Sequence, residues 1–317
     1  MNLITHRLPS TARAAAPGLW RACKSLFALL LLAWLALLPT TARAAELQAV
    51  LTLLEGDAAV VVGARAYTAA VGARLDAGAL LETDAKTSLL RLEWPDGTVL
   101  DLGPATRVML RPPALAAGKS PLFYLLQGWA KQSQASAAPG QLSSAFDVRV
   151  FKGALVSQVD GNTAVCFAET GDTQLVARRS GQPLTLQPGQ AAVLGIDGFA
   201  QAQSRPPAGW LQRIPPAFRD TLPPRAAQFT GPPTALNAQA ALSYQVLQPW
   251  LTAEAAVRRN FPARFAELLR DREFHAAVTR HLAQHPEWEP VVRPLSKSKP
   301  KPKPIPNNVA TDPEPPR

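Results

Sequence analysis

The sequence predicts a mainly β protein: a sandwich- or roll-like β domain, then a small α-helical region and a disordered tail. Three observations lead to this fold class. Short apolar runs, separated by turn residues every 8–12 residues or so, recur between about residues 47 and 200. Residues 242–292 are instead rich in Ala, Leu, Arg and Glu and show helical periodicity. Residues 293–317 are dominated by Lys and Pro and lack the apolar residues to bury a core.

The clearest strands are two alternating runs, residues 90–94 and 99–102, each expected to have one wet face and one buried face. Between them lie Pro95, Asp96, Gly97 and Thr98. Pro presets φ at the first turn position and Gly accepts a positive φ, so this stretch predicts a hairpin turn. Five further runs are predicted to be strands: residues 47–53, 58–62, 153–159, 164–167 and 191–196.

The β region, residues 45–200, admits two organisations. It is either two related halves, about 45–132 and 146–200, or a single meander whose strands resemble one another. The stretch from Ser133 to Gly140 is small and polar, which is typical of a loop between halves.

Residues 201–241 are rich in Pro, which fixes φ and removes a hydrogen-bond donor, so they predict an extended linker. The interspersed Trp210, Ile214, Phe218 and Phe229 indicate that this segment packs against the protein. In the helical region, Pro262 separates two helices, Asp271 is placed to cap a third over residues 272–285, and Phe274 and Val278 begin its apolar stripe.

The N-terminal 44 residues have the pattern of an export signal. Basic residues precede a 13-residue apolar run, residues 26–38, which is too short to span a bilayer. Ala42 and Ala44 occupy the two small-residue positions that a signal peptidase reads, so cleavage is expected before Ala45. An uncleaved anchor is the alternative. The mature chain is then expected not to span the membrane, because no second long apolar run follows.

The net charge of +10 belongs mainly to the two ends of the chain. Residues 45–292 carry 22 basic and 21 acidic residues and are close to neutral. No basic stripe with interleaved aromatics remains there, so nucleic acid is not an expected partner. The Lys-Pro tail, residues 293–317, reads as a solubilising segment or as one that contacts anionic envelope surfaces.

A search for catalytic or metal-binding sets yields little. His281 and His285 are four residues apart, but they lie on the apolar face of the last helix, where packing is the expected role. Glu82 and Asp84 read as solvated turn residues. Cys166 stands alone in an apolar run and reads as a small buried hydrophobe. We therefore expect no enzyme, no catalytic residue, no metal site and no cofactor.

Residues 56–110 resemble a FecR domain. The resemblance depends on glycines and turns that include Gly78, the Asp96-Gly97-Thr98 turn, Gly103 and Pro104, while Asp84 stands where the family often has Gly. These residues specify backbone geometry and not a ligand. The best-known FecR proteins join this domain to a cytoplasmic sigma-factor regulator domain through a membrane helix. Only 25 residues precede the apolar run here, so the resemblance implies a free-standing periplasmic FecR-like protein.

Two functions from different classes follow from this resemblance. The first is an adaptor that binds an envelope protein in signalling or assembly. The second is a peptidoglycan- or carbohydrate-binding β module, because β-sandwiches often present aromatic side chains to sugars. Candidates for such a platform are Trp94, Trp129, Trp210, Trp250 and Trp288, for each of which core packing is the expected role.

Overall fold

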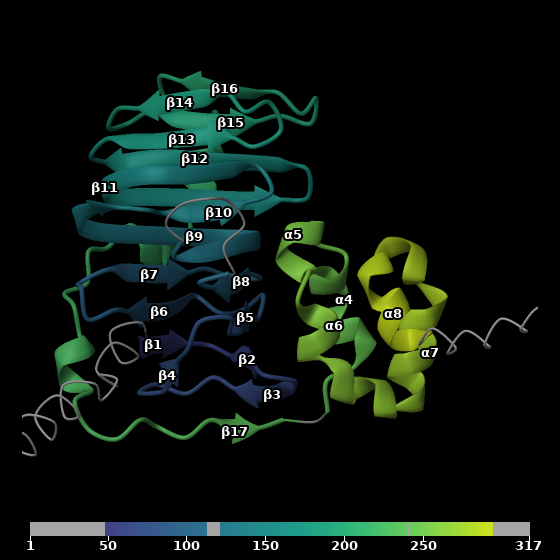
Figure 1. Cartoon of the computed structure of the whole chain (residues 1–317). Helices are drawn as coiled ribbons and strands as arrows, with labels where there is room; N and C mark the ends of the chain where they lie inside the picture. Colours follow the sequence, from purple (N-terminus) through teal and green to yellow (C-terminus); the bar gives the residue numbers. More distant parts are fainter. Residues whose placement is uncertain (1–47, 113–120, 240, 294–317) are drawn as a thin grey trace, which may run out of the picture. The chain divides into compact units, whose positions relative to one another are not determined.

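A computed structural model describes residues 48–112, 121–239 and 241–293. The described residues contain seventeen strands that belong to one continuous sheet (Figure 1). The first eight are β1 (Ala49–Glu55), β2 (Ala58–Val62), β3 (Arg65–Thr68), β4 (Arg74–Leu75), β5 (Leu80–Thr83), β6 (Leu89–Glu93), β7 (Val99–Leu102) and β8 (Arg107–Leu110). The next nine are β9 (Phe123–Ala138), β10 (Gln141–Ser143), β11 (Phe146–Asp160), β12 (Thr163–Thr170), β13 (Thr173–Ala177), β14 (Pro183–Leu186), β15 (Ala191–Leu194), β16 (Ala200–Gln203) and β17 (Asn237–Ala238).

The sheet folds over itself into two layers. In one layer, which we call the strap layer, the strand order is β4-β1-β6-β7-β9-β11-β12-β15-β16. In the other, the helix layer, the order is β17-β3-β2-β5-β8-β9-β10-β11-β13-β14. The long strands β9 and β11 occur in both orders, and every pairing is antiparallel except that of β9 with β10.

Two glycines mark the points where the long strands pass from one layer to the other. β9 crosses at Gly128, where φ is +93°, and an added Cβ there would lie 2.5 Å from the Cα of Thr106. β11 crosses at Gly153, where φ is +105° and a Cβ would overlap the carbonyl oxygen of Thr170. Both corners therefore require glycine for its backbone freedom and for its lack of a side chain.

The main hydrophobic core lies between the two layers. In β6, Leu90 and Leu92 point into it, and β5 contributes Leu81 from the opposite layer. The long strands supply the aromatic side chains Phe123, Phe146 and Phe151, which are at most 1% exposed. Because side chains alternate along a strand, the residues between these apolar ones face outward.

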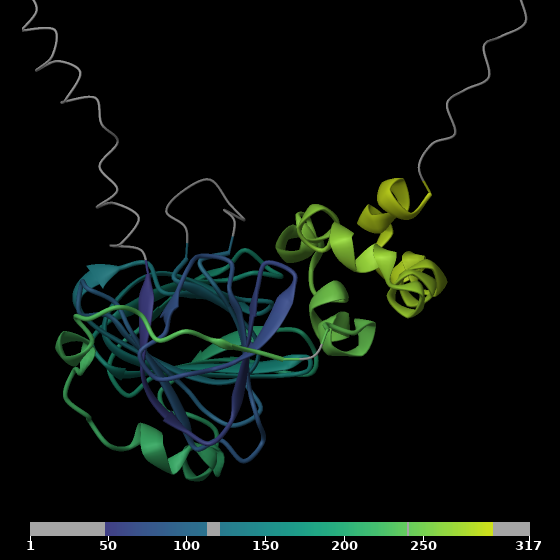
Figure 2. The same cartoon turned by 90° about the horizontal axis from the view of Figure 1, so that it is seen from below.

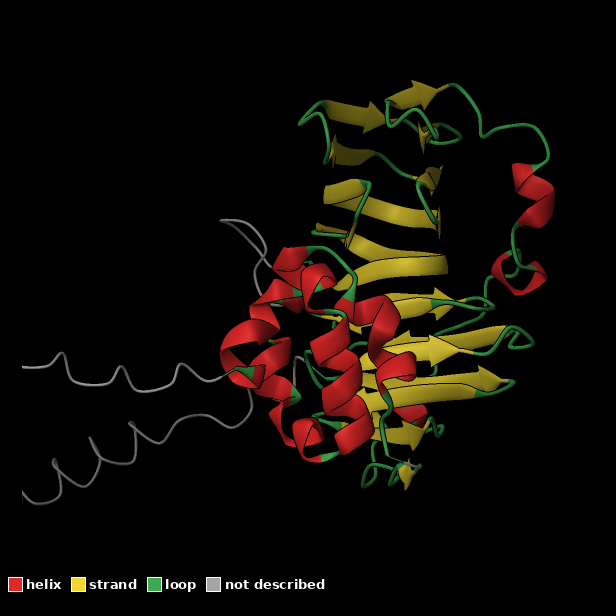
Figure 3. Ribbon diagram, turned by 90° about the vertical axis from the view of Figure 1, so that its right-hand side faces the viewer, coloured by secondary structure: helices red, strands yellow, loops and turns green. Residues whose placement is uncertain are grey.

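Both outward faces are covered as well, by different parts of the chain (Figures 2 and 3). The Pro-rich segment of residues 205–239, which we call the strap, contains α3 (Trp210–Arg213), η1 (Pro216–Phe218) and η2 (Ala226–Gln228). Its Trp210 packs on Trp129 of β9 with ring centroids 5.3 Å apart, within a cluster that also holds Ile214 and Phe218. The strap therefore covers the strap layer.

The C-terminal helices cover the helix layer. They are α4 (Tyr244–Leu251), α5 (Ala255–Arg258), α6 (Phe261–Arg264), η3 (Ala266–Arg270), α7 (Arg272–Arg280), η4 (Leu282–Gln284), η5 (Pro286–Trp288) and α8 (Glu289–Val292). Their buried Leu247, Phe265 and Val278 belong to one cluster with Met109 and Tyr124 of the sheet.

One arginine ties the helices to the strand loops. Arg264 donates hydrogen bonds to the carbonyl oxygens of Val61 at 3.1 Å, Gly63 at 2.9 Å and Gly78 at 2.6 Å. Its guanidinium also lies 4.8 Å from the centre of the Phe265 ring. Burial lowers the pKa of Arg264 to about 10, which keeps the side chain charged at neutral pH.

The predicted fold class is confirmed, as are the hairpin of β6 and β7 and the capping role of Asp271, which accepts the amide of Phe274 at 2.8 Å. The expected loop from Ser133 to Gly140 is wrong, because residues 133–138 continue β9. The expected wet face of residues 90–94 is also wrong, because every residue of β6 is buried. The helix predicted over residues 272–285 is shorter and ends at Arg280 as α7.

The leader with Ala42, Ala44 and Ala45 lies outside the described residues, as does all of the Lys-Pro tail after Arg293. Among the described helices, none combines the length and the hydropathy that crossing a bilayer would take.

Candidate functional site

The turn residues singled out by the sequence hold the backbone at strand ends. Gly97 has a φ of +82° in the turn between β6 and β7, where the Asp96 carboxylate accepts the amide of Thr98 at 2.9 Å. Trp94 and Thr98 close this turn with a backbone hydrogen bond of 2.9 Å. The geometry is that of a hairpin turn with an Asx bond, as the residue types suggest.

The other predicted turn residues also serve the backbone. Gly78 has a φ of +82° between β4 and β5, and its amide donates to the carbonyl of Leu110 at 2.6 Å. Gly103 follows β7, and its carbonyl accepts the hydroxyl of Thr83 at 2.6 Å. The carbonyl of Pro104 accepts the hydroxyl of Thr106 at 3.1 Å. These contacts are structural, and the structure does not bring the predicted turn residues together into one site.

A row of alternating charges crosses the outer face of the strap layer. Arg91, Asp101 and Lys131 are register partners on β6, β7 and β9. Arg91 binds both carboxylate oxygens of Asp101, at 2.7 and 2.8 Å, and Lys131 Nζ lies 2.8 Å from Oε2 of Glu169 on β12. The side chains of Arg91, Asp101 and Lys131 are 4%, 5% and 8% exposed, so the row is largely removed from water.

The strap covers this row through backbone hydrogen bonds. Arg91 donates to the carbonyl of Leu222 at 3.1 Å, and Lys131 donates to the carbonyl of Phe218 at 2.6 Å. The buried carboxylate of Glu93 accepts the amides of Arg225 and Ala226, both at 2.7 Å. Hydrogen bonds to charged groups are stronger than neutral ones, so these contacts fix the path of the strap.

Burial disfavours the charge on both members of the central ion pair, so by itself it lowers the pKa of Arg91 and raises that of Asp101. It opposes the charge of Arg91, but the hydrogen bond and charge of Asp101 outweigh it and raise the pKa of Arg91. Burial also raises the pKa of Asp101 above its usual range, while Arg91 and Lys131 act to lower it. The bidentate geometry favours an ionised Asp101 at neutral pH, so the row acts as a fixed ionic network.

A cleft of about 370 Å³ opens between the charged row and the strap. The row forms one wall, the strap residues Asp220 to Pro224 form the other, and Ser133, Gly153 and Thr170 also line it. Lys131 and Arg91 direct their donors at carboxylates and strap carbonyls, as described above. The polar groups left to face the cleft include carboxylates, which accept hydrogen bonds, and hydroxyls, which both accept and donate them.

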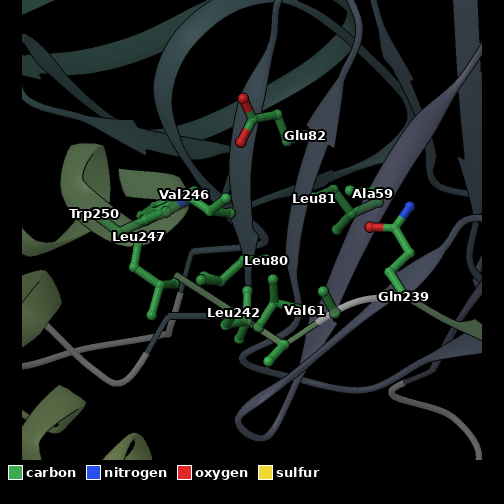
Figure 4. A pocket seen from close by; sticks show the side chains of 12 residues that line it. Ala59, Val61, Leu80, Leu81, Glu82, Gln239, Leu242, Val246, Leu247 and Trp250 are labelled. Carbon is green, nitrogen blue, oxygen red and sulfur yellow. The ribbon is translucent and has the colours of Figure 1, made fainter. Parts of the chain in front are cut away.

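A second, smaller pocket of about 150 Å³ lies between the helix layer and α4 (Figure 4). Its walls are the apolar side chains of Val61, Leu80, Leu247 and Trp250, and Glu82 lies at one side. Glu82 is paired with Arg107 at 2.5 Å, which leaves the pocket itself apolar. Its volume suits a single apolar side chain better than a cofactor.

The candidate reactive residues do not assemble into a catalytic set. Glu82 lies on a strand and not in a turn, while Asp84 caps its own turn by accepting the amide of Lys86 at 2.8 Å. Cys166 is fully buried in the main core, and burial raises its pKa to about 12. A thiol in this state is neutral and unreactive.

The two histidines predicted to share a helix face pack around one tyrosine. His285 is fully buried, and its Nε2 lies 3.2 Å from the hydroxyl of Tyr244. The ring of His281 stacks on that of Tyr244 at 5.4 Å. Within residues 48–112, 121–239 and 241–293, no three His, Cys, Asp or Glu side chains cluster as metal ligands would.

The five tryptophans considered as a sugar platform are all in the interior. Trp94, Trp210, Trp250 and Trp288 are at most 2% exposed, and Trp129 is 9% exposed. Their flat surfaces are used for packing, so none offers a stacking face to a carbohydrate.

Exposed apolar side chains gather instead at the tip of the hairpin that joins β15 to β16. Ile196 is 87% exposed and Phe199 is 68% exposed, the two largest values among the described large apolar residues. β16 pairs with β15 on one side, and among the described strands none pairs with its other side. An open edge beside exposed apolar side chains is a typical site for a protein partner.

Sequence reasoning missed both the charged row and the apolar tip. Arg91 and Asp101 stand in runs with clear alternation, so they were expected to face water. The strap that buries them follows more than 100 residues later in the chain. Ile196 and Phe199 flank Asp197 and Gly198, a turn signal that marks the hairpin but does not show that its apolar neighbours stay exposed.

Comparisons with known proteins find little that resembles this chain. No protein-family model matches it, and no curated protein matches it. Two crystal structures titled "putative anti-sigma factor", from Parabacteroides distasonis at 2.50 and 1.65 Å resolution, are similar at 15% and 14% identity with TM-scores of 0.34. Each match covers 40% of this chain and spans 59% of the other chain, so it leaves much of both proteins unmatched. At this TM-score the likeness carries no argument about function.

Proposed function

We propose that this protein is a non-enzymatic, FecR-like binding protein of the periplasm that serves as an adaptor in envelope signalling or assembly. The observation that carries the proposal is the exposed tip of the β15–β16 hairpin. There the side chains of Ile196 and Phe199 are exposed to solvent beside the unpaired edge of β16. A partner could bury both side chains and add a strand to this edge, which is a common mode of peptide recognition.

The location in the periplasm rests on the leader pattern of residues 1–44 and on the FecR-like turn residues. The leader pattern predicts export and cleavage before Ala45, and the FecR resemblance implies the same compartment. The mass of the protein purified from an envelope fraction tests this directly, since the mature chain begins at Ala45. A protein that retains residues 1–44 in the membrane fraction would contradict cleavage.

The adaptor proposal is tested by photo-crosslinking in cells from a probe placed at position 199 of the full chain. The matched control is a probe at Val71, a side chain that is 41% exposed and lies in the turn between β3 and β4. We expect one dominant protein adduct from position 199, absent from position 71 and lost when Ile196 is changed to Ser. The same adducts from both positions, or none from position 199, would overturn the proposal.

A further inference from the structure

The cleft between the charged row and the strap is a polar site that the adaptor proposal leaves unused. Its two cations, Arg91 and Lys131, are already directed at Asp101, Glu169 and the strap carbonyls. Lys131 engages only Oε2 of Glu169, which is 35% exposed, so Oε1 of Glu169 and the carboxylate of the exposed Asp220 can accept further hydrogen bonds. A ligand that matches this cleft must therefore bring donors, and preferably positive charge.

The charges around the cleft favour the same kind of ligand. The lining holds three carboxylates, Asp101, Glu169 and Asp220, against the two cations. Four exposed charged residues lie within two residues of lining positions, Asp96, Asp172, Lys152 and Arg219, and their charges cancel, so the excess of one negative charge comes from the lining itself. The cleft and its rim are thus net negative, and a partly buried negative site attracts ammonium groups.

The chain itself contains a segment that carries several positively charged hydrogen-bond donors. Residues 297–303 read Lys-Ser-Lys-Pro-Lys-Pro-Lys, four ammonium groups with no acidic residue among them. Its prolines favour an extended chain, which lowers the entropy lost when such a segment is held in a cleft. The opposite wall of the cleft, Asp220 to Pro224, is itself Pro-rich and contributes one carboxylate, while Arg219 and Arg225 lie just outside it in the sequence.

The distance from Arg293 to the cleft decides whether the Lys-Pro segment that enters the cleft belongs to the same chain or to a second copy. The last described residue, Arg293, belongs to the helices that cover the helix layer, whereas the cleft lies on the outer face of the strap layer. Residues 294–303 extend about 31 Å in a polyproline conformation. A globular chain of this size has a radius of gyration of about 18 Å, so the path around it to the far layer is longer than that.

We propose that the cleft binds the Lys-Pro segment, residues 297–303, of a second copy of this chain. Each copy then offers one cleft and one segment on different parts of its surface. Such contacts build either a pair of copies that exchange their segments, a larger ring or an open chain. This association uses no residue of the β15–β16 tip, so it can fail or hold independently of the adaptor function.

The first experiment measures binding of a labelled peptide of residues 294–306 to the chain of residues 45–317. We expect the affinity to fall about tenfold in Glu169→Gln with Asp220→Asn, the loss of two partly exposed ion pairs. The matched control is Glu267→Gln with Glu273→Gln, two exposed carboxylates of the C-terminal helices. An equal effect of both pairs, or none from the cleft pair, would overturn the proposal. A folding defect in the double variant would also weaken binding. Asp220→Asn is therefore measured alone as well, because it alters only an exposed residue.

The second experiment follows the mass of the chain of residues 45–317 by light scattering as its concentration rises. We expect association that weakens with salt and is abolished by Lys→Gln changes at positions 297, 299, 301 and 303. The free peptide should compete with it. A chain that stays monomeric at all concentrations would show that the cleft does not hold a second copy.

Discussion

At the scale of single residues, many polar side chains in the interior of the sheet have a hydrogen-bond partner. Gln134 donates to the carbonyl of Phe151 at 2.7 Å, and Thr52 donates to Glu93 at 2.8 Å. Burial of a polar group without such a bond costs about 1–3 kcal/mol. Several buried side-chain atoms lack such a bond among the described residues, including Oε1 of Gln132 and Oγ1 of Thr173 in the sheet and Nδ1 of His285 in the helical region.

His285 should make folding stability depend on pH. Burial lowers its pKa below the ordinary 6.5; Glu287 opposes this shift, while Arg258 and His281 add to it. As pH falls below about 6.5, the unfolded chain takes up a proton before the folded one does, so stability falls. We expect the free energy of unfolding in urea to drop between pH 7.5 and 5.5, and to drop less in His285→Gln. His275→Gln should leave the drop unchanged, because His275 is exposed; a drop of equal size in both variants would exclude this origin.

At the scale of elements, the corner glycines Gly128 and Gly153 should be sensitive to substitution. Gly128→Ala places a Cβ 2.5 Å from the backbone of Thr106 at a positive φ, so it adds a clash to conformational strain. We expect it to destabilise the protein by about 2–5 kcal/mol. The control is Gly63→Ala, which has a φ of +60° with nothing within 4 Å and should cost only about 1–2 kcal/mol. Chemical denaturation measures both, and equal losses would contradict a steric origin.

The same elements show what the sequence can and cannot predict. The β6–β7 hairpin and the Asp271 cap follow from local turn and cap chemistry, which a few residues determine. The strand character of residues 133–138 does not, because its Ser, Gln and Ala residues become strand only through pairing with β11. The cleft could not be predicted from the sequence either, because its two walls come from residues that lie far apart in the chain.

At the scale of the whole molecule, two segments that would not fold alone stabilise the two outer faces of the sheet. The strap combines an apolar cluster around Trp210 with backbone hydrogen bonds to buried charges, whereas the helices rely mainly on an apolar cluster. This division means that the attachment of the helices depends on few polar contacts. Arg264 donates to the carbonyls of Val61, Gly63 and Gly78, and an ion pair joins Arg178, which follows β13, to Glu254 of the helical region.

Arg264→Leu should therefore loosen the helices without unfolding the sheet. The substitution leaves three carbonyl oxygens without their donor while it keeps an apolar side chain near Phe265, and we expect a loss of about 1–3 kcal/mol. Hydrogen exchange should accelerate in α4 to α7 and remain slow in β6, β7 and β9, because the core between the layers does not involve Arg264. Arg272→Leu, at an exposed position of α7, serves as the matched control. Acceleration throughout the sheet would mean that the helices and the β layers unfold as one cooperative unit.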